Sequence, residues 1–422
     1  MNILVIGSGG REHALVWKIA QSPRVKKIYC ANGNAGIRSL AECIAIKPED
    51  IHALADFAAS HTIDLTVVGS ETPLTLGIVD LFESRGLKIF GPSAKAAEIE
   101  GSKVFSKQLM KKYGIPTAAF ETFDNADQAR SWIRSYDKPC VVKTDGLAAG
   151  KGAIVCMSTS EALDAVDQIM SDKQFGSAGS QIVVEAFMEG EEASIFAVTD
   201  GTNYVVLPAA QDHKRALDGD LGKNTGGMGA YAPAPVATHV VIERTKKEII
   251  EPTLAAMAHE GRTYKGVLYC GIMVTPDGPK VVEFNCRFGD PECQVLMMLI
   301  SSDIVDLFQS VADNNLDPSA VTISDAHAAC VVMASGGYPD AYAKGKIVNG
   351  LHTPLPENCA VFHAGTDWNE NNIITNGGRV LGISATGADL KKALDTAYTV
   401  TREIHFENAF YRKDIGHRAL KK

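Results

Sequence analysis

Two kinds of long run are missing from this chain: a cluster of lysine and arginine, and an apolar stretch of about 18 residues, the length needed to span a membrane. Acidic residues outnumber basic ones, 50 to 41, and the net charge is −9. Because a surface for nucleic-acid backbones needs a basic patch, this balance disfavours a nucleic-acid partner. The missing apolar run disfavours a membrane span. Any anionic ligand must therefore be held by a few local cations.

Cysteine motifs are missing as well. The nine cysteines are scattered, and no two of them form a Cys-x-x-Cys pair. This pattern disfavours both a zinc site and a disulfide framework, and it is typical of buried, reduced thiols. The chain enters a strand-like run at Asn2–Ile6 without a basic and apolar leader, so we expect a cytoplasmic protein.

What is present indicates a folded chain of several domains. Hydrophobic residues make up 45% and charged residues 22%, close to globular averages. A chain of 422 residues suggests two to four domains. Residues 1–92 alternate short apolar runs with helical periods, which predicts an open parallel sheet with crossover helices. After the turn at 91–93, Lys103–Lys112 is expected to form a helix capped by Ser102.

Three further units are expected along the chain. Residues 115–190 predict a small unit of strands and two helices, which leads into a larger body that ends near residue 325. From residue 326 onward, short strands are expected between glycine-rich turns. Segments 211–215 and 224–231 contain too few apolar residues to predict a helix or a strand. Structureless stretches in a compact enzyme are usually functional.

A carboxylate and an amide stand two residues apart in a predicted strand. Because side chains alternate across a strand, Glu283 and Asn285 should share one face. Magnesium that holds nucleotide phosphates takes one or two protein oxygens, which suits this pair, although an exposed strand end would have the same pattern. The Arg287 that follows could hold carboxylate or phosphate oxygens in its planar fork, or it could pair only with Asp290 or Glu292.

A loop of small residues follows Lys143 at the end of another predicted strand. Residues 144–152 contain three glycines and two alanines, and Lys143 and Lys151 bracket most of them. Exposed backbone donors and compact lysine charges favour phosphate, so we expect a lid that orders over a nucleotide. Gly152 stands where a Walker loop needs Ser or Thr, and a plain flexible hairpin is the alternative.

Two other segments fit more than one function. The apolar edge Val183–Met188, with Glu192 beyond it, fits either recognition of adenine and ribose or a hinge between domains. The turn Gly7–His13 follows the first strand and opens a helix, which is where such sheets bind anions, but a simple tight turn would look the same. Glu12 replaces the third glycine of the dinucleotide fingerprint, which disfavours a dehydrogenase.

Taken together and in this order, these segments resemble the glycinamide ribonucleotide synthetase family, also called phosphoribosylamine–glycine ligases. The likeness covers essentially the whole chain, and Gln211–Arg215 and Asn285–Glu292 are specific to that family. It implies an ATP-grasp protein that uses ATP and Mg²⁺ (or Mn²⁺) in purine biosynthesis to ligate glycine to 5-phosphoribosylamine through glycyl phosphate. The implied products are glycinamide ribonucleotide, ADP and phosphate. The implied partners are these small molecules, with no nucleic acid and no membrane, in a monomer or weak dimer.

The resemblance also implies an α/β and α+β multidomain plan and a set of site residues. An N-terminal open parallel-sheet domain would cover residues 1–101, an ATP-grasp domain 102–325 with a lid at about 115–190, and a β-rich C-terminal domain 326–422. By the same resemblance, Lys103, Lys143, Lys151, Gly152, Glu185, Met188 and Glu192 would bind ATP; Glu283 and Asn285 would bind the metal; Gly9, Gly10, Glu71, Gly289 and Asp290 would bind substrate; and Arg287, Asp212 and Lys214 would be catalytic.

One departure from the ATP-grasp pattern leaves the number of metal ions open. Many of these enzymes have a further metal carboxylate about twelve residues before the second one, but here position 271 is glycine. The alternative functions are another ATP-grasp carboxylate–amine ligase or carboxylase, and a non-catalytic nucleotide-binding regulator on the same fold. Loss of Lys143 or Glu283 would mark the regulator, and both are present.

Overall fold

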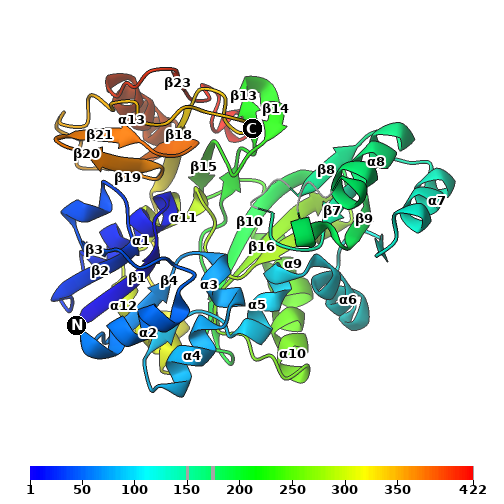
Figure 1. The fold of residues 1–422 in the computed structure, drawn as a ribbon, viewed down its shortest axis with the longest axis horizontal. Coiled ribbons are helices and arrows are strands. Elements are labelled where there is room, and N and C mark those ends of the chain that lie inside the picture. Colours follow the sequence, from blue (N-terminus) through cyan, green and yellow to red (C-terminus); the bar gives the residue numbers. More distant parts are fainter. Residues whose placement is uncertain (149–151, 173–175, 422) are drawn as a thin grey trace.

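The computed structural model of the chain describes residues 1–148, 152–172 and 176–421, and its elements fall into four groups (Figure 1). The N-terminal group is a sheet of five parallel strands in the order β3-β2-β1-β4-β5. This confirms the expected open parallel sheet. Its elements are β1 (Asn2–Gly7), α1 (Gly10–Ile19), β2 (Lys27–Asn32), β3 (Glu42–Ile44), α2 (Ile51–Ser60), β4 (Leu65–Val68), α3 (Glu71–Thr75), α4 (Ile78–Ser84) and β5 (Ile89–Phe90).

Two helices, α5 (Ala94–Gly101) and α6 (Lys103–Tyr113), lead to the lid at the right of Figure 1. The hydroxyl of Ser102 accepts the Phe105 N–H at 3.0 Å, so the predicted cap is confirmed. The lid is an antiparallel sheet in the order β6-β9-β7-β8 with its own small apolar core under two helices. Its elements are β6 (Phe120–Phe123), α7 (Ala126–Tyr136), β7 (Cys140–Thr144), β8 (Ala153–Cys156), α8 (Thr159–Val166) and β9 (Ile182–Ala186).

The central body contains a four-stranded antiparallel sheet in the order β11-β10-β16-β17. Residues 239–259 form two α-helices separated by a π-helical turn, Lys246–Ile250. Val282 falls at a register shift between β16 and β17, which makes it a β-bulge. The elements are β10 (Glu191–Thr199), β11 (Tyr204–Val206), α9 (His239–Thr245), α10 (Glu251–His259), β16 (Gly266–Thr275), β17 (Gly278–Asn285), α11 (Glu292–Leu299) and α12 (Ile304–Ala312).

The expectation that segments 211–215 and 224–231 form no regular element is wrong. They contain β12 (Gln211–Asp212) and most of β15 (Gly229–Ala232), and between them runs the hairpin of β13 (Arg215–Leu217) and β14 (Leu221–Asn224). The main chain of β15 pairs with β18, and this tertiary pairing imposes a strand on small residues of low strand propensity. The β12–β15 pair therefore extends the C-terminal sheet into the central body.

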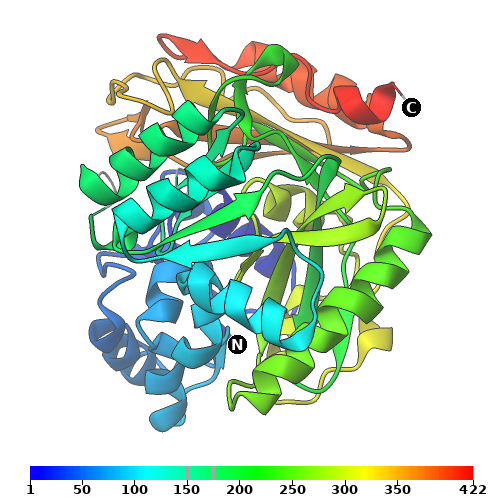
Figure 2. The same cartoon turned by 90° about the vertical axis from the view of Figure 1, so that its right-hand side faces the viewer.

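The C-terminal group is β-rich, as predicted, but two of its strands are long. β18 (His327–Ser335) and β22 (Arg379–Gly387) each span nine residues, where short strands were expected. Helix α13 (Leu390–Glu403) covers this sheet, as Figure 2 shows at the top of the molecule. The remaining elements are β19 (Cys359–His363), β20 (Thr366–Asn369), β21 (Asn372–Thr375), β23 (Ala409–Phe410) and α14 (His417–Leu420).

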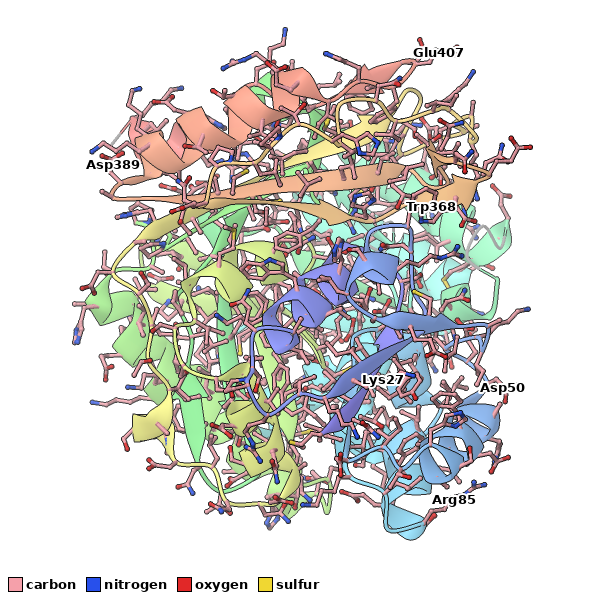
Figure 3. The ribbon with its side chains drawn as sticks, turned by 90° about the vertical axis from the view of Figure 1, so that its left-hand side faces the viewer. Lys27, Asp50, Arg85, Trp368, Asp389 and Glu407 are labelled. Atoms are coloured by element: carbon pink, nitrogen blue, oxygen red, sulfur yellow. The ribbon has the colours of Figure 1, made fainter. Side chains whose placement is uncertain are left out.

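The C-terminal group also contacts the N-terminal group directly. Trp368 of β20 lies at this junction (Figure 3), and its indole N–H donates to the Ala35 carbonyl at 3.3 Å. Deeper in the junction, the His363 N–H donates to Nδ1 of His13 at 2.7 Å. Burial lowers the pKa of His13 to about 3, so its ring is a neutral acceptor. Within the described residues, no helix has the length and apolarity to cross a membrane.

Candidate active site

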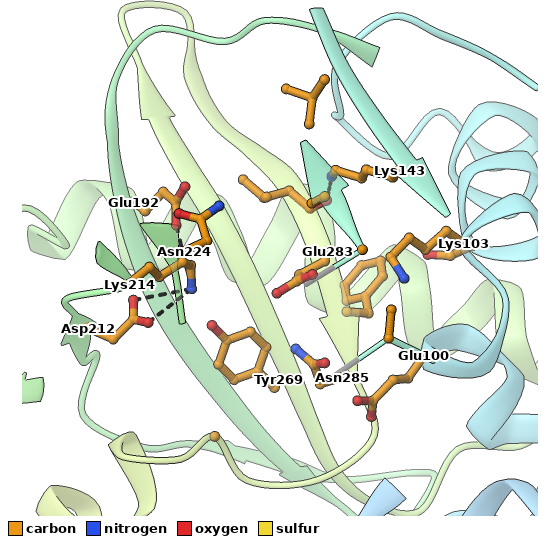
Figure 4. Close-up of a pocket in the computed structure, with 18 of the residues that line it drawn as sticks. Glu100, Lys103, Lys143, Glu192, Asp212, Lys214, Asn224, Tyr269, Glu283 and Asn285 are labelled. Atoms are coloured by element: carbon orange, nitrogen blue, oxygen red, sulfur yellow. Dashed lines mark hydrogen bonds and ion pairs between the residues drawn. The ribbon is translucent and has the colours of Figure 1, made fainter. Parts of the chain in front are cut away.

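Side chains from all four groups of elements line one cavity of about 390 Å³. Figure 4 shows charged residues on several strands converging on it. Most of the residues that the sequence resemblance selected meet here, although they come from positions far apart in the chain. The predicted residues on its wall are Glu71, Lys103, Lys143, Gly152, Glu185, Met188, Glu192, Asp212, Lys214, Glu283, Asn285, Arg287, Gly289 and Asp290.

The carboxylate–amide pair lies on β17 as expected, with both side chains directed into the cavity (Figure 4). Burial alone would raise the pKa of Glu283, but three lysines and Arg287 lower it, so this carboxylate is charged at neutral pH. A Cβ atom on Gly271 would lie 3.1 Å from the Tyr269 ring and 3.4 Å from Glu283. A side chain at this position would therefore press on the Tyr269 ring. The three lysines are Lys214, Lys143 and Lys103.

Lysines and one buried glutamate make up the lid side of the cavity. Lys143 at the end of β7 pairs with Glu185 at 2.9 Å and donates to the Val282 carbonyl at 2.9 Å. Lys107 of α6 also pairs with Glu185, at 3.0 Å. Burial would raise the pKa of Glu185, but the two lysines lower it. Lys103 donates to the Gly146 carbonyl at 3.3 Å.

A second network surrounds Arg287 on the cavity wall. Its Nε donates to Glu71 at 3.1 Å, and its Nη2 pairs with Glu100 at 2.9 Å. The alternative that Arg287 pairs only with Asp290 or Glu292 is therefore wrong, because both partners come from the N-terminal third of the chain. Burial would raise the pKa of Glu71, but Arg287 and Arg11 outweigh it and lower the pKa to about 2.

Asp212 and Lys214 stand side by side on the third wall (Figure 4). Lys214 Nζ lies 3.1 Å from Asp212 Oδ2 and 3.7 Å from Glu192. Burial alone would lower the pKa of Lys214, but Asp212 and other acidic groups raise it well above its usual value. The lysine is therefore a cation. A cation, two carboxylates and the β17 pair thus face one another across the cavity.

Two of the predicted residues that the structure describes, Gly9 and Gly10, are not on the cavity wall. The Gly9 N–H is occupied by Glu12 at 2.6 Å, and the space beside Gly10 is filled by Gln294. The carboxylate of Glu12 thus accepts the N–H of the N-cap residue of α1, which is one half of a capping box, and glycine has no side chain for the other half. Lys151 lies outside the described residues, as do Ala149 and Gly150 of the expected lid loop.

Other cavity residues were not selected from the sequence, among them Arg11, Glu100, Lys107, Tyr269, Glu292 and Arg379. One signal was available for Lys107, because it lies four residues after Lys103 and therefore on the same helix face. Arg379 reaches the site from β22 and donates to the Asp290 carbonyl at 2.6 Å. No local pattern marks Arg379 or Glu100, because the tertiary fold alone brings them to the cavity.

Among the described residues, no three His, Cys, Asp or Glu side chains are placed to hold a metal ion by themselves. A magnesium ion that carries nucleotide phosphates needs only one or two protein oxygens. Glu283 and Asn285 provide a charged and a neutral oxygen on one strand face. The donor set therefore fits a hard cation that binds together with a nucleotide.

Three family models match the chain in succession. They describe the phosphoribosylglycinamide synthetase N domain over residues 1–100, its ATP-grasp (A) domain over 101–293 and its C domain over 328–418. The chain belongs to the phosphoribosylglycinamide synthetase family. A phosphoribosylamine–glycine ligase from Rhizobium meliloti is 50% identical, and the match covers 100% of this chain and 99% of that one. Its counterpart from Vibrio cholerae is 48% identical with the same coverage.

Solved structures agree with this family assignment. The crystal structure of phosphoribosylamine–glycine ligase from Thermotoga maritima has a TM-score of 0.85 at 33% identity, covering 98% of this chain and all of that one. A biotin carboxylase domain from Hydrogenobacter thermophilus, solved with MgADP, has a TM-score of 0.75 at 15% identity, covering 97% and 91%. The second likeness shows the fold alone.

These findings confirm the predicted family, the ATP-grasp fold and the assignment of the chain as a ligase. ATP-grasp enzymes as a class use ATP with a divalent cation. The boundaries predicted for the domains and the roles predicted for individual site residues remain predictions.

Proposed function

We propose that this ligase joins glycine to 5-phosphoribosylamine at the expense of ATP, in the cytoplasm, and forms glycinamide ribonucleotide through glycyl phosphate. The observation that supports it most is the meeting of three chemistries in one cavity: the Glu283–Asn285 pair, a lysine-rich lid side, and an acceptor side around Arg287 and Lys214. The first two suit ATP phosphates. The third suits a carboxylate and an amine.

The proposed ATP side uses lysines and the edge of the lid. Lys103 and Lys143 would contact the phosphates, since both are cavity cations within the electrostatic reach of Glu283. Glu185, Met188 and Glu192 would line the adenine and ribose end. Gly152 and Lys151 would belong to the loop that covers the phosphates.

Glu283 and Asn285 would hold Mg²⁺, or Mn²⁺ in its place. When bound, the ion neutralises charge on the phosphates and makes the terminal phosphorus easier to attack. The lysines contribute to the same neutralisation beside the partly buried Glu283, where each charge acts more strongly than in bulk solvent.

The chemistry on the acceptor side follows from the low reactivity of a carboxylate. A carboxylate oxygen of glycine takes the terminal phosphoryl group of ATP, the bond to the ADP oxygen breaks, and glycyl phosphate forms. Arg287 would hold the glycine carboxylate in line, because its fork is already fixed by Glu71 and Glu100. Gly289 and Asp290, next along the chain, would border the substrate.

The second step forms the amide. The amine of phosphoribosylamine attacks the acyl carbon, the bond to phosphate breaks, and the nitrogen loses a proton. We assign that proton to Asp212, whose carboxylate is held by Lys214 at 3.1 Å, and charge stabilisation on the departing phosphate to Lys214. No cysteine or serine nucleophile is needed. Gly9, Gly10 and Glu71 would lie toward the phosphoribosylamine.

Assays that leave out one or both of the acceptor substrates test this function. ADP release is measured with glycine and phosphoribosylamine together, with each alone and with neither, and the amide product is identified by mass. We expect rapid ADP release only with both substrates. Full turnover without glycine would indicate a different ATP-grasp ligase or carboxylase, and nucleotide binding without turnover under any condition would indicate the regulator.

A further inference from the structure

The segment that contains Asp212 and Lys214 presents alternate side chains to two different surroundings. Successive side chains of an extended chain point to opposite faces. Asp212 and Lys214 line the cavity, whereas the side chain of His213 between them is fully buried. The His213 N–H donates to the Gly229 carbonyl at 2.9 Å, and its own carbonyl accepts from Met228 at 2.8 Å. Contacts to the His213 ring therefore help to set where both cavity side chains stand.

The contact to that ring comes from the end of the chain. We define the C-terminal tail as residues 412–418. The Gly416 N–H donates to Nε2 of His213 at 2.9 Å, so Nε2 is an acceptor and the ring is neutral. Gly416 has φ +82°, a conformation that favours glycine and that turns this N–H toward the ring. The tail is thus hydrogen-bonded to the residue that lies between the two proposed catalytic residues.

A second contact from the tail is made to the residue that follows Lys214 in the chain. The side chain of Arg412 is fully buried, and its Nη1 donates to the Arg215 carbonyl at 3.1 Å and to Asp220 at 2.9 Å. Its other two nitrogens donate to the carboxylate of Asp414, each at 2.8 Å. A buried guanidinium with this many partners has a single geometry. Lys214 is therefore flanked on both sides by residues that the tail holds.

The tail also holds the β13–β14 hairpin through one ion pair and two hydrogen bonds from backbone N–H groups to carboxylates. Arg418 donates to Asp220 at 2.8 Å, the Gly219 N–H donates to Asp414 at 2.8 Å, and the Lys413 N–H donates to Asp218 at 2.8 Å. The far strand of the hairpin returns to the cavity wall. There the N–H and hydroxyl of Thr225 both donate to the carbonyl of Lys214 at 2.8 Å. Both strands of the hairpin thus connect the tail to the backbone of Lys214.

We propose that the C-terminal tail is a latch that positions Asp212 and Lys214, with His213 and Arg412 as its positioning residues. Neither residue touches substrate; each acts on the backbone that carries the two cavity side chains. The proposal rests on the proposed function, which gives Asp212 and Lys214 their roles. A displacement of about 1 Å in a reacting group can cost about 100-fold in rate. Loosening the latch should therefore lower kcat and leave ATP binding, which uses other elements, unchanged.

Paired variants of the full chain test the latch. His213→Leu removes the acceptor at similar size, whereas His213→Gln keeps an amide oxygen where Nε2 stood. Lys413→Ala is the matched control in the same tail, because Lys413 meets the hairpin through its backbone N–H. The measurements are kcat, KM for each substrate, Kd for ATP and the temperature of thermal unfolding. We expect His213→Leu to lower kcat about 10- to 100-fold with the ATP Kd within about twofold, while His213→Gln and Lys413→Ala stay within about threefold of wild type.

Two results would overturn the latch. One is a His213→Leu protein that unfolds at a lower temperature but turns over at the wild-type rate when folded. That result would show that His213 contributes only to packing. The other is an equal loss of kcat in His213→Gln and His213→Leu, because the acceptor would then be irrelevant. If His213→Leu does not fold, Arg412→Lys takes its place, since lysine keeps the charge but cannot also reach the Arg215 carbonyl; unchanged kcat there overturns the latch.

A Lys214→Met arm separates this proposal from the function on which it rests. We expect Lys214→Met to lose most of its turnover. Wild-type turnover in that variant would overturn the role of Lys214, and the latch would have nothing to position. Loss of turnover in Lys214→Met together with a fully active His213→Leu protein would overturn the latch alone.

Discussion

The two sides of the cavity hold charge in different ways. On the lid side, Lys107 and Lys143 share one carboxylate, that of Glu185, and Lys103 donates to the backbone carbonyl of Gly146. On the acceptor side, cations are matched by carboxylates drawn from remote parts of the chain, as Arg287 is by Glu71 and Glu100. The lid side therefore retains positive charge for an incoming polyphosphate. The acceptor side is already neutralised and is built to orient small substrates.

The strongest test of this contrast is to remove the carboxylate of Glu283, the negative charge that both sides of the cavity share. Glu283→Ala takes away the only charged oxygen of the proposed metal pair, so the phosphates would lose their cation. We expect ADP formation to fall by at least about 1,000-fold, with circular dichroism and thermal unfolding close to wild type. Turnover near the wild-type rate at ordinary magnesium concentration would refute the metal assignment.

The acceptor side should depend on geometry more than on charge. Arg287→Lys keeps the charge but cannot reach Glu71, Glu100 and a substrate carboxylate with parallel donors. We expect kcat to fall about 100-fold, with the Kd for ATP within about threefold of wild type. Weaker ATP binding at unchanged kcat would show that Arg287 serves ATP and not the acceptor substrates.

The matched charges of the acceptor side should appear as a pH-dependent stability. The folded-state pKa of Glu71, about 2, lies below the ordinary glutamate value of about 4.5. A lowered carboxylate pKa stabilises the fold above the unfolded-state pKa, and this contribution is lost as the pH falls toward 2. We expect Glu71→Gln to lower the free energy of unfolding by about 2 kcal/mol above pH 5. Urea titrations between pH 3 and 7 should show the difference shrinking as pH falls; a constant difference would contradict the ion-pair account.

On the lid side, the expected effect is smaller and concerns ATP. Burial lowers the pKa of Lys107 to about 8. If the Lys107 ammonium is removed, Lys143 is the remaining lysine of the two that pair with Glu185. Lys107→Met should therefore draw Lys143 away from the phosphates and raise the KM for ATP about 10-fold, with little change in kcat. Lys111→Met on the same helix is the control. An unchanged KM for ATP would show that Glu185 does not compete for Lys143.

The parts of the fold that could be predicted from the sequence are those whose pattern is local. Runs such as Ile3–Ile6 and Leu65–Val68 are buried strands of the N-terminal sheet, and the alternation in Val281–Asn285 places its two polar side chains in the cavity. The cap at Ser102 is equally local. Each of these features needs only neighbours within a few residues, so its physics is visible in the sequence.

The features that could not be predicted depend on contacts between remote segments. β15 is a strand because β18 pairs with it about 100 residues later in the sequence. Arg287 donates a hydrogen bond to Glu71, which lies 216 positions earlier in the sequence. Composition could not reveal these outcomes, because each depends on which groups the tertiary fold brings together.

The central claim is that glycine is activated as an acyl phosphate in this cavity, and isotope transfer tests it most directly. Glycine labelled with ¹⁸O in both carboxylate oxygens is turned over with ATP and phosphoribosylamine, and the released phosphate is analysed by mass. The account predicts one ¹⁸O atom in each phosphate, because the oxygen that attacks phosphorus leaves with it when the amide forms. Phosphate free of label, at normal product yield, would contradict the account.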